Sequence, residues 1–213
     1  MAGGAKRPET NFWKLLKGVA AGPNTLGAIL PQGHVLQRQK GEFFQKNGQP
    51  MFNEQGKITV EARPLGGGHG GYQLLASDTG GPNCETVYWL PWKDNSATSV
   101  KRTAFENDCN FFMTSRMTGC RFSLTPTMAL HVANSPYENS GRTSDDRTMI
   151  EEGLTGPRPV GTSRVVSAAS AHPNDIQYDH MYGALIFGMK LYTGNWVYKV
   201  LELPTRPGSW TII

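Results

Sequence analysis

Residues 107–135 read NDCNFFMTSRMTGCRFSLTPTMALHVANS, and this stretch decides the fold. Short apolar runs alternate in it with residues that favour turns, a pattern typical of strands joined by tight connections. We expect strands over 121–124 and 128–133, and either a strand or a short helix over 104–114. The segment therefore predicts adjacent strands in a β-rich domain.

Outward from this stretch, alternation of apolar and polar residues predicts further strands over 57–62, 72–76, 85–92 and 164–169. Residues 184–192 and 195–203 predict a β-hairpin. An amphipathic helix is expected over 11–21, and one helical turn near 145–152 in an otherwise loop-like segment. Together these elements favour an α+β fold dominated by antiparallel or mixed β-sheets.

The length and composition bound the possible classes of protein. A chain of 213 residues predicts a single domain over 1–213 with a real core, in which residues 1–9 are expected to form a mobile tail. The 25 glycines and 14 prolines indicate many turns. A net charge of +4, without a long basic run, does not indicate nucleic-acid binding. No apolar stretch has the length of a signal peptide or a membrane span, so we expect no membrane partner.

The chain has three cysteines, and because this number is odd at least one thiol is free in the monomer, so a disulfide framework is not expected. Cys120 follows Gly119, which permits a sharp turn that exposes the thiol, and His131 lies one strand later. A cysteine and a histidine placed in this way can form a nucleophile with its general base. Thr114 supplies a hydroxyl that can orient the imidazole. The Gly119 and Cys120 N–H groups are candidates for binding an oxyanion.

The other two cysteines have simpler interpretations. Cys84 lies in a Gly-Pro-Asn turn, and Cys109 stands beside Asp108, whose carboxylate is expected to raise the thiol pKa. Both are expected to be structural or incidental. A buried cysteine is usually inert packing, so the same interpretation stays open for Cys120.

Metal binding is not expected. His69 lies in a glycine-rich turn, and His172 and His180 flank Asp175 and Asp179 without the further ligands that a metal site requires. We interpret these histidines as solvated loop residues. The expected chemistry therefore requires no metal and no cofactor.

The sequence also carries a resemblance to a known family. The motifs are Trp89-Leu-Pro-Trp-Lys93, Phe111-Phe112-x-Thr114, Met117-Thr118-Gly119-Cys120 and Leu130-His131-Val132. Over about 89–133 they resemble the glutamine deamidase toxins of the Burkholderia lethal factor type. Those toxins are related to the catalytic domain of the cytotoxic necrotizing factors and to the chemotaxis receptor deamidases. Two departures are Met117, where the family usually has Leu, and Val-Ala-Asn after the histidine.

The resemblance implies a fold, a reaction and a setting. The fold is a sandwich of two mixed β-sheets flanked by short helices and long loops. The reaction converts a specific glutamine of a host protein to glutamate through a thioester on Cys120, with His131 as base and Thr114 as its orienting group. The implied partner is the RNA helicase of translation initiation or a small GTPase, so translation inhibition is one expected effect. The implied protein is a monomeric bacterial effector, exported without a recognisable signal peptide, that acts in the target-cell cytosol.

Two alternatives stay open on the residues alone. The same Cys–His pair can serve a thiol protease or an enzyme of the transglutaminase type. The chain can also be a non-enzymatic β-sandwich binding module in which Cys120 is part of the core. Release of ammonia from a protein substrate separates the first interpretation from the others, and absence of a reactive thiol favours the last.

Overall fold

The computed structural model describes the central and C-terminal parts of the chain most fully. The described residues are 37–38, 44–46, 49–51, 55–64, 72–76, 80–81, 84–93, 96–133, 143–167, 172–173, 175–179, 183–202 and 210–212. The tail over 1–9 and the helix expected over 11–21 lie outside this set. The segment that carries Thr114, Cys120 and His131 lies wholly within it.

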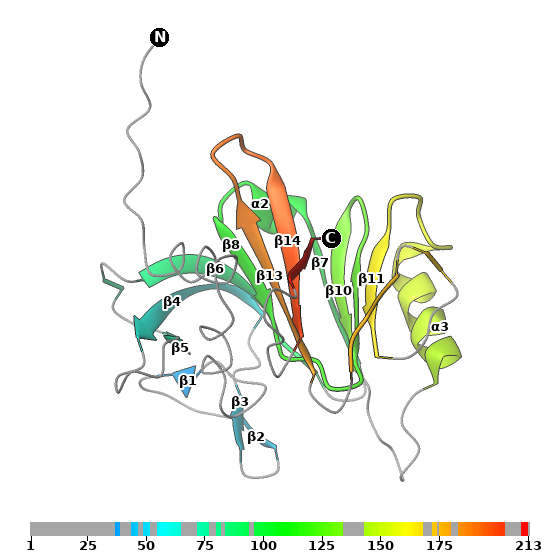
Figure 1. The fold of residues 1–213 in the computed structure, drawn as a ribbon, viewed down its shortest axis with the longest axis horizontal. Helices are drawn as coiled ribbons and strands as arrows, with labels where there is room; N and C mark the ends of the chain where they lie inside the picture. The colour runs from blue at the N-terminus through cyan, green and yellow to red at the C-terminus, as the bar shows by residue number, and fades with distance from the viewer. Residues whose placement is uncertain are drawn as a thin grey trace.

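The described strands form two main sheets and a small two-stranded one (Figure 1). The large sheet has eight strands in the order β1-β5-β4-β6-β8-β13-β14-β15. Their bounds are Gln37–Arg38 (β1), Tyr72–Ala76 (β5), Gly56–Pro64 (β4), Cys84–Leu90 (β6), Phe111–Thr114 (β8), Ala184–Lys190 (β13), Trp196–Glu202 (β14) and Trp210–Ile212 (β15). The sheet is mixed, because β6 pairs with β8 in parallel and β8 pairs with β13 in antiparallel orientation.

The small sheet has five strands in the order β12-β11-β9-β10-β7. Their bounds are Asp175–Gln177 (β12), Ser163–Val166 (β11), Arg121–Leu124 (β9), Met128–Val132 (β10) and Ala97–Lys101 (β7). It is also mixed, because β11 pairs with β12 in parallel and with β9 in antiparallel orientation. A separate hairpin pairs β2 (Phe44–Lys46) with β3 (Gln49–Met51).

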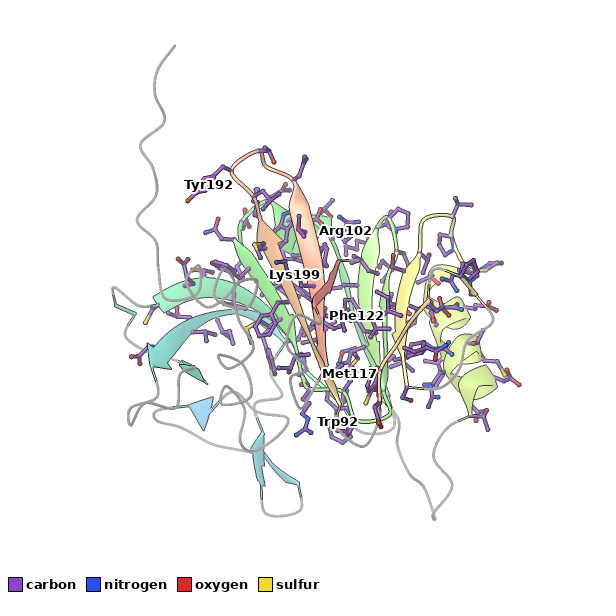
Figure 2. All side chains as sticks on the ribbon, viewed as in Figure 1. Trp92, Arg102, Met117, Phe122, Tyr192 and Lys199 are labelled. Atoms are coloured by element: carbon purple, nitrogen blue, oxygen red, sulfur yellow. The ribbon has the colours of Figure 1, made fainter. Side chains whose placement is uncertain are left out.

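The core joins the two main sheets. Phe112 of β8 and Phe122 of β9 are both buried, and their ring centroids lie 5.9 Å apart. Figure 2 shows Phe122 in the central region of the sandwich. Aromatic side chains contribute large buried areas, so this contact between the sheets is a substantial part of the packing. The expected sandwich of two mixed β-sheets is therefore confirmed.

Most of the expected strands are confirmed, with shifted ends. β9 matches the expected bounds, and β10 ends one residue earlier than expected. The segment 104–114 contains both proposed structures, since it holds α2 (Thr103–Glu106) and then β8. The hairpin of β13 and β14 is confirmed, and Gly194 at its turn has a φ of 87°, a conformation that favours glycine. β6 ends at Leu90, short of the expected 92.

The helix expected near 145–152 is present, but it is longer than the single turn expected. α3 spans Ser144–Thr155 and lies beside the small sheet, next to β11 (Figure 1). Its start is fixed by a capping box, in which Thr143 and Asp146 exchange hydrogen bonds between side chain and backbone. Among the described residues, no helix is long and apolar enough to cross a membrane.

Candidate functional site

The structure brings Thr114 and His131 together across the interior of the sandwich. Thr114 is the last residue of β8 in the large sheet, and His131 lies in β10 of the small sheet. Thr114 Oγ1 lies 2.6 Å from His131 Nδ1, a short hydrogen-bond distance. The expected contact between the threonine hydroxyl and the imidazole is therefore confirmed, and it links the two sheets.

The hydrogen bonds of Thr114 determine the tautomer of the imidazole. Thr114 Oγ1 donates to the backbone oxygen of Leu90 at 2.8 Å, which uses the only proton of the hydroxyl. The same oxygen must then accept from His131, so Nδ1 carries the ring proton. In the neutral imidazole this leaves Nε2 with the lone pair, and hence as the basic atom of the ring.

Cys120 is placed by the pairing of β9 with β10. His131 pairs with Phe122, and Val132 pairs with Arg121, so side chains of each pair share one face of the sheet. Cys120 directly precedes β9, and it joins Phe122 in the buried core cluster between the sheets. Cys120 therefore lies on the same side of the small sheet as His131, two residues before the Phe122 that pairs with the histidine.

All three predicted catalytic side chains are buried. The exposed fractions of the residues are 1% for Thr114, 3% for Cys120 and 0% for His131. Burial strengthens electrostatic interactions between a thiolate and an imidazolium, because little water screens them. It also limits the access of a substrate to the thiol.

Sequence reasoning missed Tyr178, which holds the backbone around the thiol. Its hydroxyl accepts a hydrogen bond from the Gly119 N–H at 2.9 Å and donates to the Cys120 carbonyl at 2.7 Å. Ser167 adds a bond from its Oγ to the Gly119 carbonyl at 3.2 Å. Tyr178 is 3% exposed, and burial raises its pKa above the usual value for tyrosine, as does the neighbouring Cys120. The phenol is therefore neutral, so it can donate and accept at once.

Gly119 has the backbone conformation that the Gly-Cys turn was expected to need. Its φ is 96°, which side chains rarely tolerate. Its N–H, one of two candidate oxyanion donors, already donates to Tyr178. A role for Gly119 in binding an oxyanion therefore requires its N–H to exchange this partner.

The other cysteines lie apart from this constellation, and all three thiols are outside disulfides. Cys109 is 1% exposed, and burial raises its pKa, with a smaller contribution from the Asp108 carboxylate. The expected direction is confirmed, but desolvation rather than Asp108 is the main cause. Cys84, at the start of β6, is the most exposed of the three.

Asp175, one of the residues considered for metal binding, forms an ion pair with an arginine instead. Asp175 Oδ1 accepts from Arg158 at 2.7 Å and lies 3.8 Å from His172 Nδ1. Within the described part of the chain, no group of three or more His, Cys, Asp or Glu residues could hold a metal ion. His69 and His180 lie outside the described residues.

The three candidate residues of the site thus come from the two main sheets and one connecting loop. Thr114 comes from β8, His131 from β10, and Cys120 from the connection between Thr114 and β9. Met117 in that connection and Trp92 after β6 lie toward the same end of the two sheets in Figure 2. The chain matches no protein-family model and shows no significant match to a curated protein.

Proposed function

We propose that the chain is a protein-glutamine deamidase that uses Cys120 as nucleophile and His131 as general base. The observation that carries the proposal is the 2.6 Å contact of Thr114 Oγ1 with His131 Nδ1. It fixes the ring so that Nε2 is the basic atom, on the sheet face that Cys120 shares. The resemblance over 89–133 supplies the choice of glutamine amide as the electrophile.

The first half of the reaction forms a thioester. Nε2 of His131 takes the thiol proton, and the Cys120 sulfur attacks the side-chain amide carbon of the glutamine. The carbonyl oxygen becomes an oxyanion, for which the Cys120 N–H is the proposed donor. The protonated imidazole then gives its proton to the departing nitrogen, the C–N bond breaks, and ammonia leaves.

The second half of the reaction hydrolyses the thioester and regenerates the free enzyme. His131 takes a proton from a water molecule, and the resulting hydroxide attacks the thioester carbon. The C–S bond breaks, the sulfur recovers its proton, and the product is a glutamate side chain. Thr114 holds the imidazole throughout, and no metal or cofactor takes part in these steps.

The proposed substrate is a protein of a target cell. A single change from glutamine to glutamate adds one negative charge, which is enough to disable a catalytic or binding glutamine. We propose the RNA helicase of translation initiation or a small GTPase as the substrate, with blocked translation as the effect in the first case. The protein would act as a monomeric bacterial effector in the target-cell cytosol.

The test uses the purified full chain and a eukaryotic cell lysate. Peptide mapping by mass spectrometry should find glutamine sites with a gain of about 1 Da, and ammonia should be released in the same reaction. The matched control is Cys120→Ser, which conserves the size of the side chain and removes the thiol. Sites that appear with the wild-type protein and not with Cys120→Ser identify the substrate.

The same experiment separates the alternatives. New peptide termini without ammonia release would assign a thiol protease. Incorporation of an added primary amine at glutamine would assign a transglutaminase-type enzyme. Identical maps for wild type and Cys120→Ser would refute the deamidase and favour a binding module, in agreement with the burial of Cys120 in the core.

A further inference from the structure

The side of the small sheet that faces α3 carries a buried cluster of charged and polar groups. β9 alternates between its two faces, so Cys120 and Phe122 enter the sandwich core while Arg121 and Ser123 lie on the opposite side. Arg164 of β11 pairs in register with Ser123, which places it on the same side. α3 covers this side and contributes Glu151.

Glu151 is shared between two arginines from neighbouring strands. Its carboxylate accepts from Arg121 Nη1 at 3.3 Å and from Arg164 Nε at 3.0 Å. Arg121 also donates to Thr148 Oγ1 at 2.8 Å. Glu151 is 0% exposed, Arg121 is 3% exposed and Arg164 is 8% exposed, so the carboxylate and both guanidinium groups are largely removed from water. One buried carboxylate thus faces two buried cations.

The pKa of Arg121 reflects the neighbouring cations as well as Glu151. Burial lowers the pKa of Arg121, Glu151 acts in the opposite direction, and the charges of Arg164 and Arg147 lower it further. Buried charges without full compensation are costly, and natural proteins pair them or bind counter-ions. The charges joined by the described ion pairs, one carboxylate and two guanidinium groups, favour an additional negative charge.

Within the described part of the chain, the buried polar atoms of this cluster that lack a hydrogen-bond partner include one on β9 and one on β11. These two are Arg164 Nη2 and Ser123 Oγ, both shielded from solvent, with residue exposures of 8% for Arg164 and 0% for Ser123. The two residues are cross-strand neighbours on one face, a spacing at which side chains interact. Buried polar groups are rarely left unsatisfied, so a single acceptor between them would satisfy both.

We propose that a small inorganic anion of chloride size binds between Ser123 Oγ and Arg164 Nη2, beneath α3. The hydroxyl and the guanidinium donate to it, and the two arginines that share Glu151 supply the opposite charge. A neutral acceptor such as water would satisfy the donors without balancing the charge. The bound anion stabilises the packing of α3 on the small sheet. This inference is independent of the proposed deamidase activity.

The test is a thermal melt of the full chain at matched ionic strength. Sodium chloride is compared with sodium gluconate, whose anion is too large to fit between the Ser123 hydroxyl and the Arg164 guanidinium. We expect the Tm of the wild type to be higher in chloride by about 3 °C or more, because a ligand that binds the folded state alone raises its stability. Ser123→Ala should lower the Tm in chloride and abolish the difference between the salts, as should Arg164→Gln.

The matched control is Ser115→Ala. Ser115 is 1% exposed and is therefore as deeply buried as Ser123, but its Oγ already accepts from the Trp92 N–H at 2.7 Å. This variant should lower the Tm equally in both salts and keep the difference that chloride makes.

Three results would overturn the proposal. A higher Tm for Ser123→Ala in both salts would show that the hydroxyl is unsatisfied, with nothing bound. A lower Tm by the same amount in both salts would assign water in place of an anion. A chloride effect that persists in Ser123→Ala would place the anion elsewhere on the protein.

Discussion

Tyr178 and Gly119 are joined by a hydrogen bond of 2.9 Å that brings β12 and the loop before β9 together. The tyrosine hydroxyl also donates a hydrogen bond to the carbonyl of Cys120, so one side chain holds the peptide groups on both sides of the candidate nucleophile's N–H. No motif in the sequence points to Tyr178, which stands far along the chain from Cys120. It is a positioning residue rather than a catalytic one.

Alkylation should identify Cys120 as the most reactive thiol. The mechanism requires His131 to raise the thiolate fraction at neutral pH, and thiolate is the species that reacts with iodoacetamide. We expect Cys120 to be labelled faster than Cys84 and Cys109 near neutral pH, as measured by peptide mapping over time. Because Cys84 is the most exposed thiol, faster labelling of Cys84 would mean that burial governs reactivity and that Cys120 is structural.

Removal of the nucleophile or the base should abolish deamidation. Cys120→Ser and His131→Ala are each expected to lower kcat/KM by about a thousandfold or more, the scale at which covalent nucleophiles and their bases act. Thermal melts of the variants provide the control for folding. Cys120→Ser with wild-type activity and an unchanged melt would exclude Cys120 from the chemistry.

Thr114 should matter through its hydroxyl alone. Thr114→Val keeps the shape but removes the group that fixes the tautomer of His131, and we expect kcat to fall by about 10- to 100-fold. Thr114→Ser keeps the hydroxyl and should retain most of the activity. Measured kcat and KM for both variants test the idea, which fails if valine and serine give the same kcat.

Tyr178→Phe should destabilise the fold and alter the thiol together. Loss of the hydroxyl leaves the Gly119 N–H and the Cys120 carbonyl without their buried partner, at a cost of about 1–3 kcal/mol. Chemical denaturation measures this loss, and the alkylation rate of Cys120 reports the displaced loop. The matched control is Tyr198→Phe, which removes a buried hydroxyl bonded to Glu106. Equal alkylation rates of Cys120 in the two variants would contradict a role of Tyr178 in positioning the thiol.

The stability of the protein should fall in alkaline solution. Burial raises the pKa of Cys109, and it raises the pKa values of Tyr178 and Tyr198, so these groups stay protonated when folded and ionise when unfolded. Their contribution is complete below the unfolded pKa values, about 8.5 for cysteine and about 10 for tyrosine, and is lost as the pH rises above them. Urea denaturation at a series of pH values measures the loss. Cys109→Ala should remove the part that begins near pH 8.5, and an unchanged profile would contradict this.

The sequence predicted the segment from β8 to β10 well because its apolar runs are short and sharply bounded. It underestimated α3, because the helix surface is mostly polar and its start depends on a capping box rather than on an apolar face. β7 has the sequence ATSVK, which is too short and polar to indicate a strand, and it becomes one by pairing with β10.

The candidate site was predictable only in part for a similar reason. The order of Thr114, Cys120 and His131 along one segment is visible in the sequence, and local pairing of β9 with β10 accounts for the face that Cys120 and His131 share. Thr114 reaches His131 only because the large and small sheets pack on each other. Contacts with Tyr178 and Ser167 depend on how distant strands pack, which local periodicity does not encode. The burial of Cys120 likewise follows from the second sheet rather than from its own neighbours.

The two unlike faces of β9 have a consequence for folding. A slip of one residue in its pairing with β10 would turn Arg121 and Ser123 into the aromatic interior and Cys120 and Phe122 out toward α3. Such a slip would bury a guanidinium among rings and separate the thiol from the imidazole. The strand therefore admits a single register, and the chemistry proposed for the thiol and the charges beneath α3 would be lost in the same event.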